Sequence, residues 1–240
     1  MVAGSLYLVR EKILWAEHHI NAFSDAKIRH FEKEGCKVEA DTHGHATAVM
    51  ATRPPLELSF IVGDCLQNLR SSLDYLVIEL CLVCKVNPTS EHSFPVCRVR
   101  PGDSATVCKS WSSSNTRNSI KGLSPAMKAE IEGLQPYHRG KDWERSDLWV
   151  IHDMCNLSKH RGIILAGTGL VKYVQGMRTA IIGQGKTDPT SDKMEMDEEF
   201  AAEITFDEGV VKGAPVWGYL NSLIGYVKNG VLPRFEGFFR

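Results

Sequence analysis

The sequence predicts an α+β protein, in which a bundle of about five helices carries an N-terminal β-hairpin and C-terminal antiparallel strands. Long stretches repeat apolar residues at three- and four-residue steps, which is typical of amphipathic helices. Shorter stretches alternate apolar and polar residues, which favours strands. The sequence has no βαβ rhythm and no glycine-rich phosphate loop, so a doubly wound α/β fold is not expected.

A length of 240 residues fits one large domain, and we expect a single domain over residues 1–240. Its helical core is predicted over residues 5–34, 58–86, 124–160 and 216–230. Strands are predicted over residues 37–52 and 163–212.

The first helix is expected from Leu6 to Glu34, with Gly35 as its stop. Its apolar side is expected to follow one row of residues: Leu6, Val9, Ile13, Ala16, Ile20, Phe23 and Ile28. Residues 37–52 alternate instead, which predicts two strands joined by a turn near residues 43–45. Pro54 ends the second strand.

The second long helix is ended by the sequence NPTS at 87–90, and a polar loop is expected over residues 91–121. Ser124 is then expected to cap a helix of about ten residues. A further helix is expected to begin at Ser146 or Asp147 and to end at Gly162.

Composition limits the classes of function. Hydrophobic residues make up 43% and charged residues 24% of the chain, as in ordinary globular proteins. The formal net charge of −1 provides no overall basic field, so any nucleic-acid binding would need a local basic patch. No apolar run reaches about 18 residues, so no membrane span is expected. Charges at residues 10–12 come too early for a signal peptide, and we expect a cytoplasmic protein whose seven scattered cysteines are free thiols.

Two of the predicted helices carry polar residues in rows. On the helix at 58–86, one row consists of Asp64, Asn68, Ser71 and Tyr75, bordered by Gln67 and Asp74. On the helix that ends at Gly162, the row consists of His152, Asn156 and His160, with Asp153 beside it. Because an unpaired buried polar group costs about 1–3 kcal/mol, we expect the two rows to meet and satisfy each other.

Such a meeting of helices would be either a structural network or a functional cleft. In the functional interpretation, the residues expected to act as acids and bases are His152, His160, Asp64 and Asp153. The residues expected to bind the ligand are Asn68, Arg70, Asp74, Tyr75, Asn156, Lys159 and Arg161. A weak metal site from Asp64, His152 and His160 is a further alternative, but the sequence has no standard metal motif and indicates no particular cofactor.

Three stretches together resemble a family of uncharacterised bacterial proteins. They are GDCLQNLRSSLDYL at 63–76, LQPY at 134–137 and LWVIHDMCNLSKHR at 148–161. The resemblance extends from the first helix to VLPRFE near the end of the chain and implies a bacterial origin. This chain departs from the family at three positions: Gln67 and Tyr75 stand where histidines are usual, and Ser158 stands where an aspartate is usual.

The helix at 58–86 is also loosely similar to the Arg-x(4–6)-His motif of HEPN helical bundles, many of which cut RNA or bind nucleotides. In that comparison Arg70 is the arginine, and Tyr75 replaces the histidine. The resemblance implies an RNA- or nucleotide-binding protein whose nuclease chemistry is altered or lost, with Arg70, Lys159 and Arg161 meeting phosphate. The alternatives are a small-molecule hydrolase that uses the same cleft, with or without a metal, and a non-catalytic interaction protein. The long first helix would also permit a homodimer.

Two other clusters have chemistry of their own. Cys81 and Cys84, with His92 and Cys97, contain the ligand types of a structural zinc site, although cysteines on an apolar helix are usually packing residues. The loop KSWSSSNTRNSIK combines an aromatic residue with three cations, which is a weak pattern for single-stranded nucleic acid. These four residues are Lys109, Trp111, Arg117 and Lys121.

Overall fold

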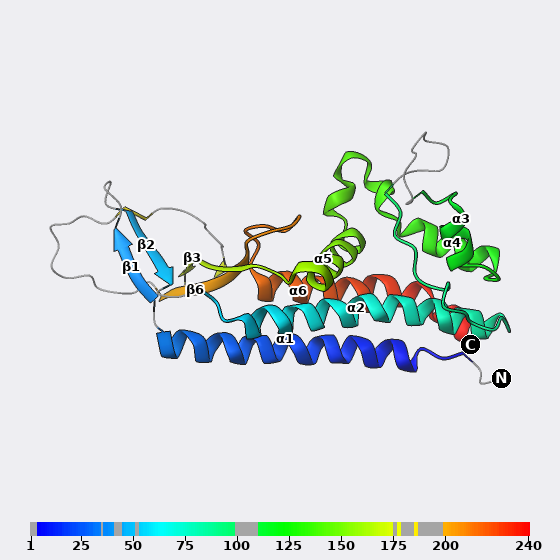
Figure 1. Cartoon of the computed structure of the whole chain (residues 1–240), viewed down its shortest axis with the longest axis horizontal. Helices are drawn as coiled ribbons and strands as arrows, with labels where there is room; N and C mark the ends of the chain where they lie inside the picture. The colour runs from blue at the N-terminus through cyan, green and yellow to red at the C-terminus, as the bar shows by residue number, and fades with distance from the viewer. Residues whose placement is uncertain are drawn as a thin grey trace.

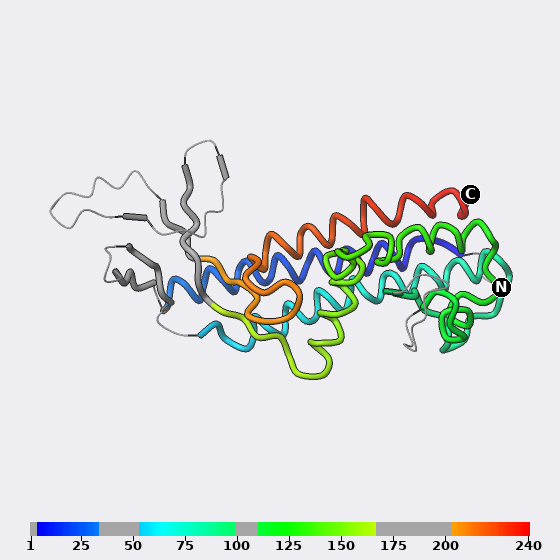
Figure 2. Tube along the Cα trace, turned by 90° about the horizontal axis from the view of Figure 1, so that it is seen from above, coloured from blue at the N-terminus to red at the C-terminus, as the bar shows by residue number. Residues whose placement is uncertain are grey.

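Three long helical segments lie side by side along the long axis of the computed structural model (Figures 1 and 2). They are α1 (Tyr7–Glu34), α2 (Leu56–Val83) and the C-terminal α6 (Val216–Gly225), which continues as a π-helical turn (Tyr226–Val231) and two short 3₁₀ segments (Leu232–Arg234 and Glu236–Phe239). The structure describes side chains over residues 4–33, 53–98, 110–166 and 203–240. It describes the backbone alone at 34, 36–40, 45–50, 167–174, 177–178, 185–186 and 199–202.

Helix α1 buries the apolar row that the sequence predicts, with one exception. Six members of the row, from Leu6 to Phe23, are almost fully buried, whereas Ile28 is 50% exposed. Ile28 lies five residues beyond Phe23, which is about 140° around the helix, and Ala26 takes the buried position instead. The outer face of α1 also leaves Leu14 and Trp15 about half exposed. The predicted homodimer stays a prediction.

Helix α2 begins and ends earlier than the predicted range of 58–86. Pro55 precedes its first turn, and Cys84 and Lys85 end the helix, with Lys85 at a φ of 58°. The chain then returns along α2 as an extended segment that buries Phe94, Val96 and Cys97. This segment brings polar backbone groups to the side of α2, where they require partners.

The predicted helical range 124–160 divides into three parts. Helix α4 (Pro125–Gly133) begins at the expected cap, since Ser124 Oγ accepts from Met127 N. A 3₁₀ segment (Pro136–Arg145) follows, and α5 (Asp147–Arg161) is capped by Ser146 and ended by Gly162 at a φ of 75°. These caps confirm both predicted starts.

The predicted polar loop over 91–121 is partly wrong. It contains a short helix, α3 (Ser114–Ser119), whose first turn is capped by Ser113 Oγ accepting from Thr116 N. Serine in this position favours a helix start even in a polar segment, because its hydroxyl satisfies a free N–H of the first turn.

The strands gather at the end of the molecule that lies away from both termini (Figure 1). Strand β1 (Cys36–Ala40) pairs antiparallel with β2 (His45–Met50), and β3 (Leu165–Val174) pairs antiparallel with β6 (Glu199–Phe206). Single bridges and two-residue strands connect these pairs, since β2 contacts β3 and β5 (Gly185–Lys186), and β3 contacts β4 (Met177–Arg178). The α+β class is confirmed. The turn of the predicted hairpin lies outside the described residues, so the hairpin itself stays a prediction.

The last strand is shorter than predicted, because β6 ends at Phe206 and residues 207–215 form turns before α6. Buried side chains from α1, α2, α5, α6 and β6 form one contiguous apolar core. Over the described residues, no helix has both the length and the hydropathy that a membrane span requires.

Candidate functional site

Helices α2 and α5 lie against each other, as the sequence predicts. They approach closely at Gly63, where a Cβ atom would collide with the hydroxyl of Ser158. One turn further along α2, Cys155 donates its thiol proton to Gln67 Oε1 at 3.2 Å, and Gln67 Nε2 donates to Ser71 Oγ at 3.1 Å. The absence of a Cβ atom at Gly63 therefore lets the two helices come close enough for their polar side chains to bond directly.

The guanidinium of Arg70 is paired within the protein through one of its nitrogens, whereas Nη1 is buried without a hydrogen-bond partner among the described residues. Its Nη2 donates to Phe94 O at 2.7 Å and forms an ion pair with Asp74 Oδ1 at 2.9 Å. Phe94 N donates to the same carboxylate oxygen at 2.9 Å. The Arg70 side chain is only 13% exposed. Arg70 and Asp74 thus hold the extended segment around Phe94 against α2, which favours a structural role for both residues.

Burial dominates the electrostatics of this contact. It raises the pKa of the Asp74 carboxyl, although Arg70, the Phe94 N–H and Lys159 act in the opposite direction. Burial also raises the pKa of the Cys155 thiol, against the opposing effects of Lys159 and Arg70. The thiol therefore stays protonated near neutral pH, where it is a hydrogen-bond donor rather than a nucleophile.

The predicted row on α2 divides between two neighbours. Asn68 and Tyr75 meet α1, because Lys12 Nζ donates to Asn68 Oδ1 at 3.3 Å and lies 5.9 Å from the centre of the Tyr75 ring. Asp64 is exposed, and its charge acts on His19 of α1. The expectation that these residues meet α5 is wrong, because each lies about 60–140° around α2 from Gly63 and Gln67, which do meet α5.

The predicted residues of α5 follow two patterns. His152 and Asn156 are half-buried and bond to each other, with 3.1 Å between Asn156 Nδ2 and His152 Nε2, and the His152 ring lies 5.7 Å from that of Trp149. Asp153 is also half-buried. Three exposed basic residues end the helix: Lys159, His160 and Arg161. They suit the negative end of the helix dipole, which is a sufficient structural reason for their presence.

Neither predicted metal alternative gains support. Among the residues that the structure describes, no three or more His, Cys, Asp or Glu side chains are grouped so that they could hold a metal ion. That statement covers the set of Asp64, His152 and His160. It also covers the cysteines at 81, 84 and 97 together with His92.

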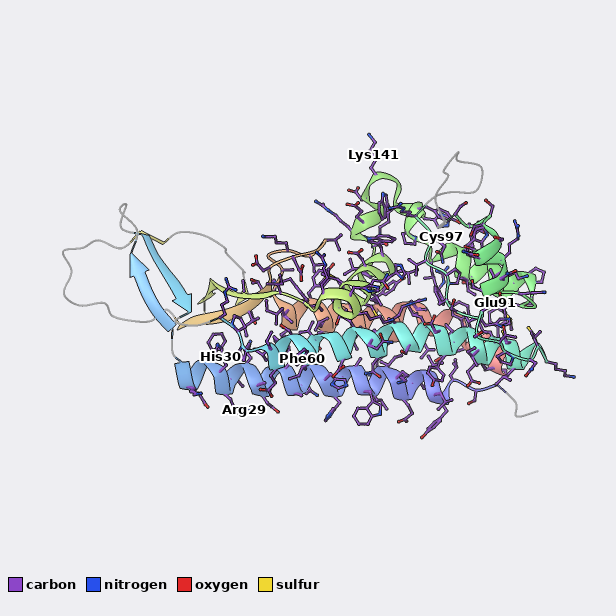
Figure 3. All side chains as sticks on the ribbon, viewed as in Figure 1. Arg29, His30, Phe60, Glu91, Cys97 and Lys141 are labelled. Carbon is purple, nitrogen blue, oxygen red and sulfur yellow. The ribbon has the colours of Figure 1, made fainter. Side chains whose placement is uncertain are left out.

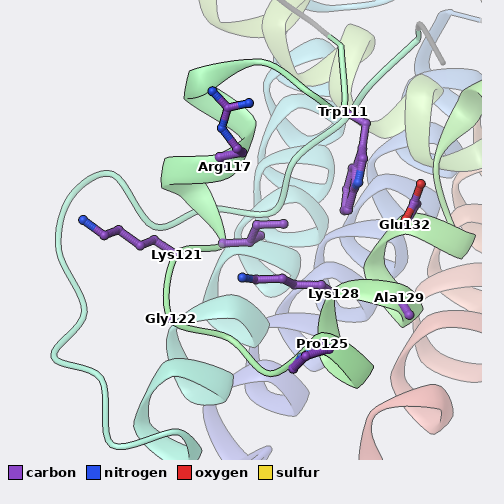
Figure 4. Close-up of a pocket in the computed structure, with 9 residues that line it drawn as sticks. Trp111, Arg117, Lys121, Gly122, Pro125, Lys128, Ala129 and Glu132 are labelled. Carbon is purple, nitrogen blue, oxygen red and sulfur yellow. The ribbon is translucent and has the colours of Figure 1, made fainter. Parts of the chain in front are cut away.

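A hollow of about 490 Å³ lies between α3 and α4, at the end of the bundle away from the sheet (Figures 1 and 4). Its charged and aromatic lining comes from the loop before α3, from α3 and its C-terminal turn, and from α4. These residues are Trp111, Arg117, Lys121, Lys128 and Glu132. Three of them belong to the basic and aromatic loop that the sequence analysis identified, while Lys109 lies outside the described residues. We call this hollow the α3–α4 pocket.

Several contacts fix the walls of the α3–α4 pocket. Arg117 Nη1 donates to Ser112 O at 2.6 Å, and Tyr137 Oη donates to Glu132 Oε1 at 3.0 Å. Gly122, at a φ of 83°, lies so close to Val86 that a Cβ atom would collide with it. The indole of Trp111 packs against the apolar core on one side and lines the pocket on the other. The walls are therefore preformed, as small-molecule sites usually are.

Sequence reasoning missed Lys128 and Glu132. They lie one turn apart on the same face of α4, and no pattern along the chain indicates that α3 and α4 line the same pocket. Searches with protein-family models, among curated proteins and among solved structures found no significant match to this chain.

Proposed function

We propose that the protein binds nucleotides or single-stranded RNA, and that the α3–α4 pocket holds one nucleotide unit. The observation that carries this proposal is the lining itself, which combines one indole with the cations of Arg117, Lys121 and Lys128 around a preformed hollow. An aromatic face stacks on any base, and cations track the phosphate backbone. A volume of about 490 Å³ is within the usual range for a small-ligand site.

The local charge supports an anionic ligand. Three positive side chains and one negative side chain give the pocket lining a formal charge of +2, whereas the whole chain has a formal charge of −1. Figure 4 shows the Lys128 side chain extending across the middle of the lining residues, whereas the ends of the Arg117 and Lys121 side chains point outward. This is the local basic patch that a nearly neutral protein would need to bind phosphate.

In this proposal the residues at the α2–α5 contact stabilise the fold and do not bind the ligand. Arg70 already has Phe94 O and Asp74 as acceptors, so we assign it to holding the fold rather than to gripping phosphate. In this proposal the protein is a HEPN-like bundle that still binds a ligand but differs near Arg70, where Tyr75 replaces the usual histidine. Tyr75 contacts Lys12 of α1 instead.

The proposal is tested by binding of a fluorescently labelled single-stranded RNA, measured by anisotropy at low and at higher salt. We expect the double variant Lys121→Ala/Lys128→Ala to bind at least about tenfold more weakly and to show a shallower salt dependence, because each phosphate contact contributes to that slope. The matched control is Lys141→Ala/Lys212→Ala, which removes the same charge at exposed sites outside the pocket. Lys141 lies on the 3₁₀ segment and points away from the long helices (Figure 3). Equal affinity of both double variants, or no affinity in the unaltered protein, would reject the proposal.

A further inference from the structure

We infer that the α3–α4 pocket prefers guanine over the other bases, because Glu132 presents a carboxylate to the edge of a base stacked on Trp111. This inference rests on the proposed function and adds base selectivity to it. It starts from a feature that phosphate binding does not explain. A site built for phosphate alone would gain nothing from a negative side chain among three positive ones, since like charges repel.

The carboxylate of Glu132 is held in place. Its Oε1 accepts from Tyr137 Oη at 3.0 Å, and its backbone oxygen accepts from Gln135 N at 2.9 Å and lies 3.0 Å from His138 Nε2. Within the described part of the chain, no group donates a hydrogen bond to Oε2. Glu132 therefore lines the pocket with a fixed carboxylate that has one oxygen available.

The positions of the neighbours match the parts of one nucleotide. Trp111 and Glu132 line the same pocket, and Figure 4 shows the Lys128 side chain extending away from the Glu132 side chain. Lys128 and Glu132 are four residues apart on α4, which is about 6 Å along the helix axis. A base stacked on Trp111 would thus have its hydrogen-bonding edge at Glu132 and its phosphate near Lys128.

A carboxylate only accepts hydrogen bonds, so it selects bases by their donors. Guanine offers two adjacent donors on its Watson–Crick edge, N1–H and the exocyclic amine. Adenine and cytosine offer one amine beside an acceptor nitrogen, and uracil offers one N–H between two carbonyl oxygens that a carboxylate repels. Bases stacked on aromatic side chains are commonly recognised through this edge. Guanine is therefore the best partner and uracil the worst.

The test is calorimetric titration of the full chain with the four ribonucleoside 5′-monophosphates at low ionic strength. We expect the guanine nucleotide to bind at least about tenfold more tightly than the uracil nucleotide, which is the discrimination of one good bidentate contact. Glu132→Gln should remove this preference or reverse it, because the amide can keep its oxygen on Tyr137 and present a donor to the base. Glu130→Gln is the matched control on the same helix, since Glu130 pairs with Arg234 and does not line the pocket.

Lys128→Ala separates this inference from the proposed function. It should weaken all four nucleotides by a similar factor and leave their ratio unchanged, because the phosphate is common to all of them. Equal binding of the four nucleotides by the unaltered protein overturns the base preference and leaves the proposed function standing. A preference that persists in Glu132→Gln also overturns it. Absence of binding by all four nucleotides counts against both.

Discussion

Replacement of Arg70 by methionine tests whether this arginine holds the fold or binds ligand. Methionine keeps the apolar stem but removes the hydrogen bond to Phe94 O and the ion pair with Asp74. The bond to the buried Phe94 carbonyl contributes about 2 kcal/mol, as is usual for a charged donor. Asp74 is 36% exposed, so its pairing with Arg70 is screened and contributes about 0.5 kcal/mol. Together, Arg70→Met should lower the free energy of unfolding by about 2.5 kcal/mol.

The loss of unfolding free energy is measured by urea unfolding followed by circular dichroism. In thermal unfolding it should appear as a fall in Tm of roughly 5–10 °C for a chain of this length. Lys141→Met, at an exposed site, is the control and should change the free energy of unfolding by less than about 0.5 kcal/mol. We expect Arg70→Met to retain its affinity for nucleotides at temperatures where it is folded. A variant with unchanged stability that no longer binds nucleotide would refute the structural assignment.

Three further predictions follow from the α2–α5 and core contacts. Because burial raises the folded-state pKa of Asp74 above its ordinary value of 3.8, its stabilising contribution is greatest at acid pH and declines as pH rises through the folded pKa. The stability difference between the native protein and Asp74→Asn, measured by urea unfolding, should therefore fall as pH rises above about 4, and a rising difference would contradict the burial argument. Gly63→Ala should be destabilising alone but should stabilise a Ser158→Ala background by up to about 1 kcal/mol, since alanine favours helices once the colliding hydroxyl is gone; additive effects in urea unfolding would mean that the helices do not touch there. Burial raises the pKa of Cys65 to about 12, so iodoacetamide should label it far more slowly than the partly exposed Cys84 in the native protein, as read by peptide mass mapping, and equal labelling would show that the α1–α2 core opens readily.

Local rules predicted the helices well. The spacing of apolar residues located α1 and α2, and the serines at 124 and 146 marked the starts of α4 and α5. The errors arose where a local rule was applied too far. Ile28 was assigned to the core by its apolar character although it lies off the buried row, and the segment after residue 110 was assigned to a loop although Ser113 caps a short helix.

The candidate site was predictable only in part, because a row of polar residues does not indicate which neighbour it will meet. Gln67 bonds to α5, and Asp74 bonds to the extended segment at Phe94. Asn68 and Tyr75, one position further along in each case, meet Lys12 of α1 instead. The pocket depends on α3 and α4 lying on either side of it, an arrangement that no periodicity along the chain indicates. Trp111 could be identified from composition, whereas Lys128 could not.

The central claim is that one nucleotide of a bound RNA lies in the α3–α4 pocket. Photo-crosslinking of the full chain to a single-stranded RNA that contains 6-thioguanosine, followed by mass mapping of the attached peptides, locates the base directly. We predict attachment at Trp111 or at peptides within residues 110–132, and its loss when unlabelled guanosine monophosphate competes. Attachment confined to α5 or to the outer face of α1, unaffected by that competitor, would contradict the account.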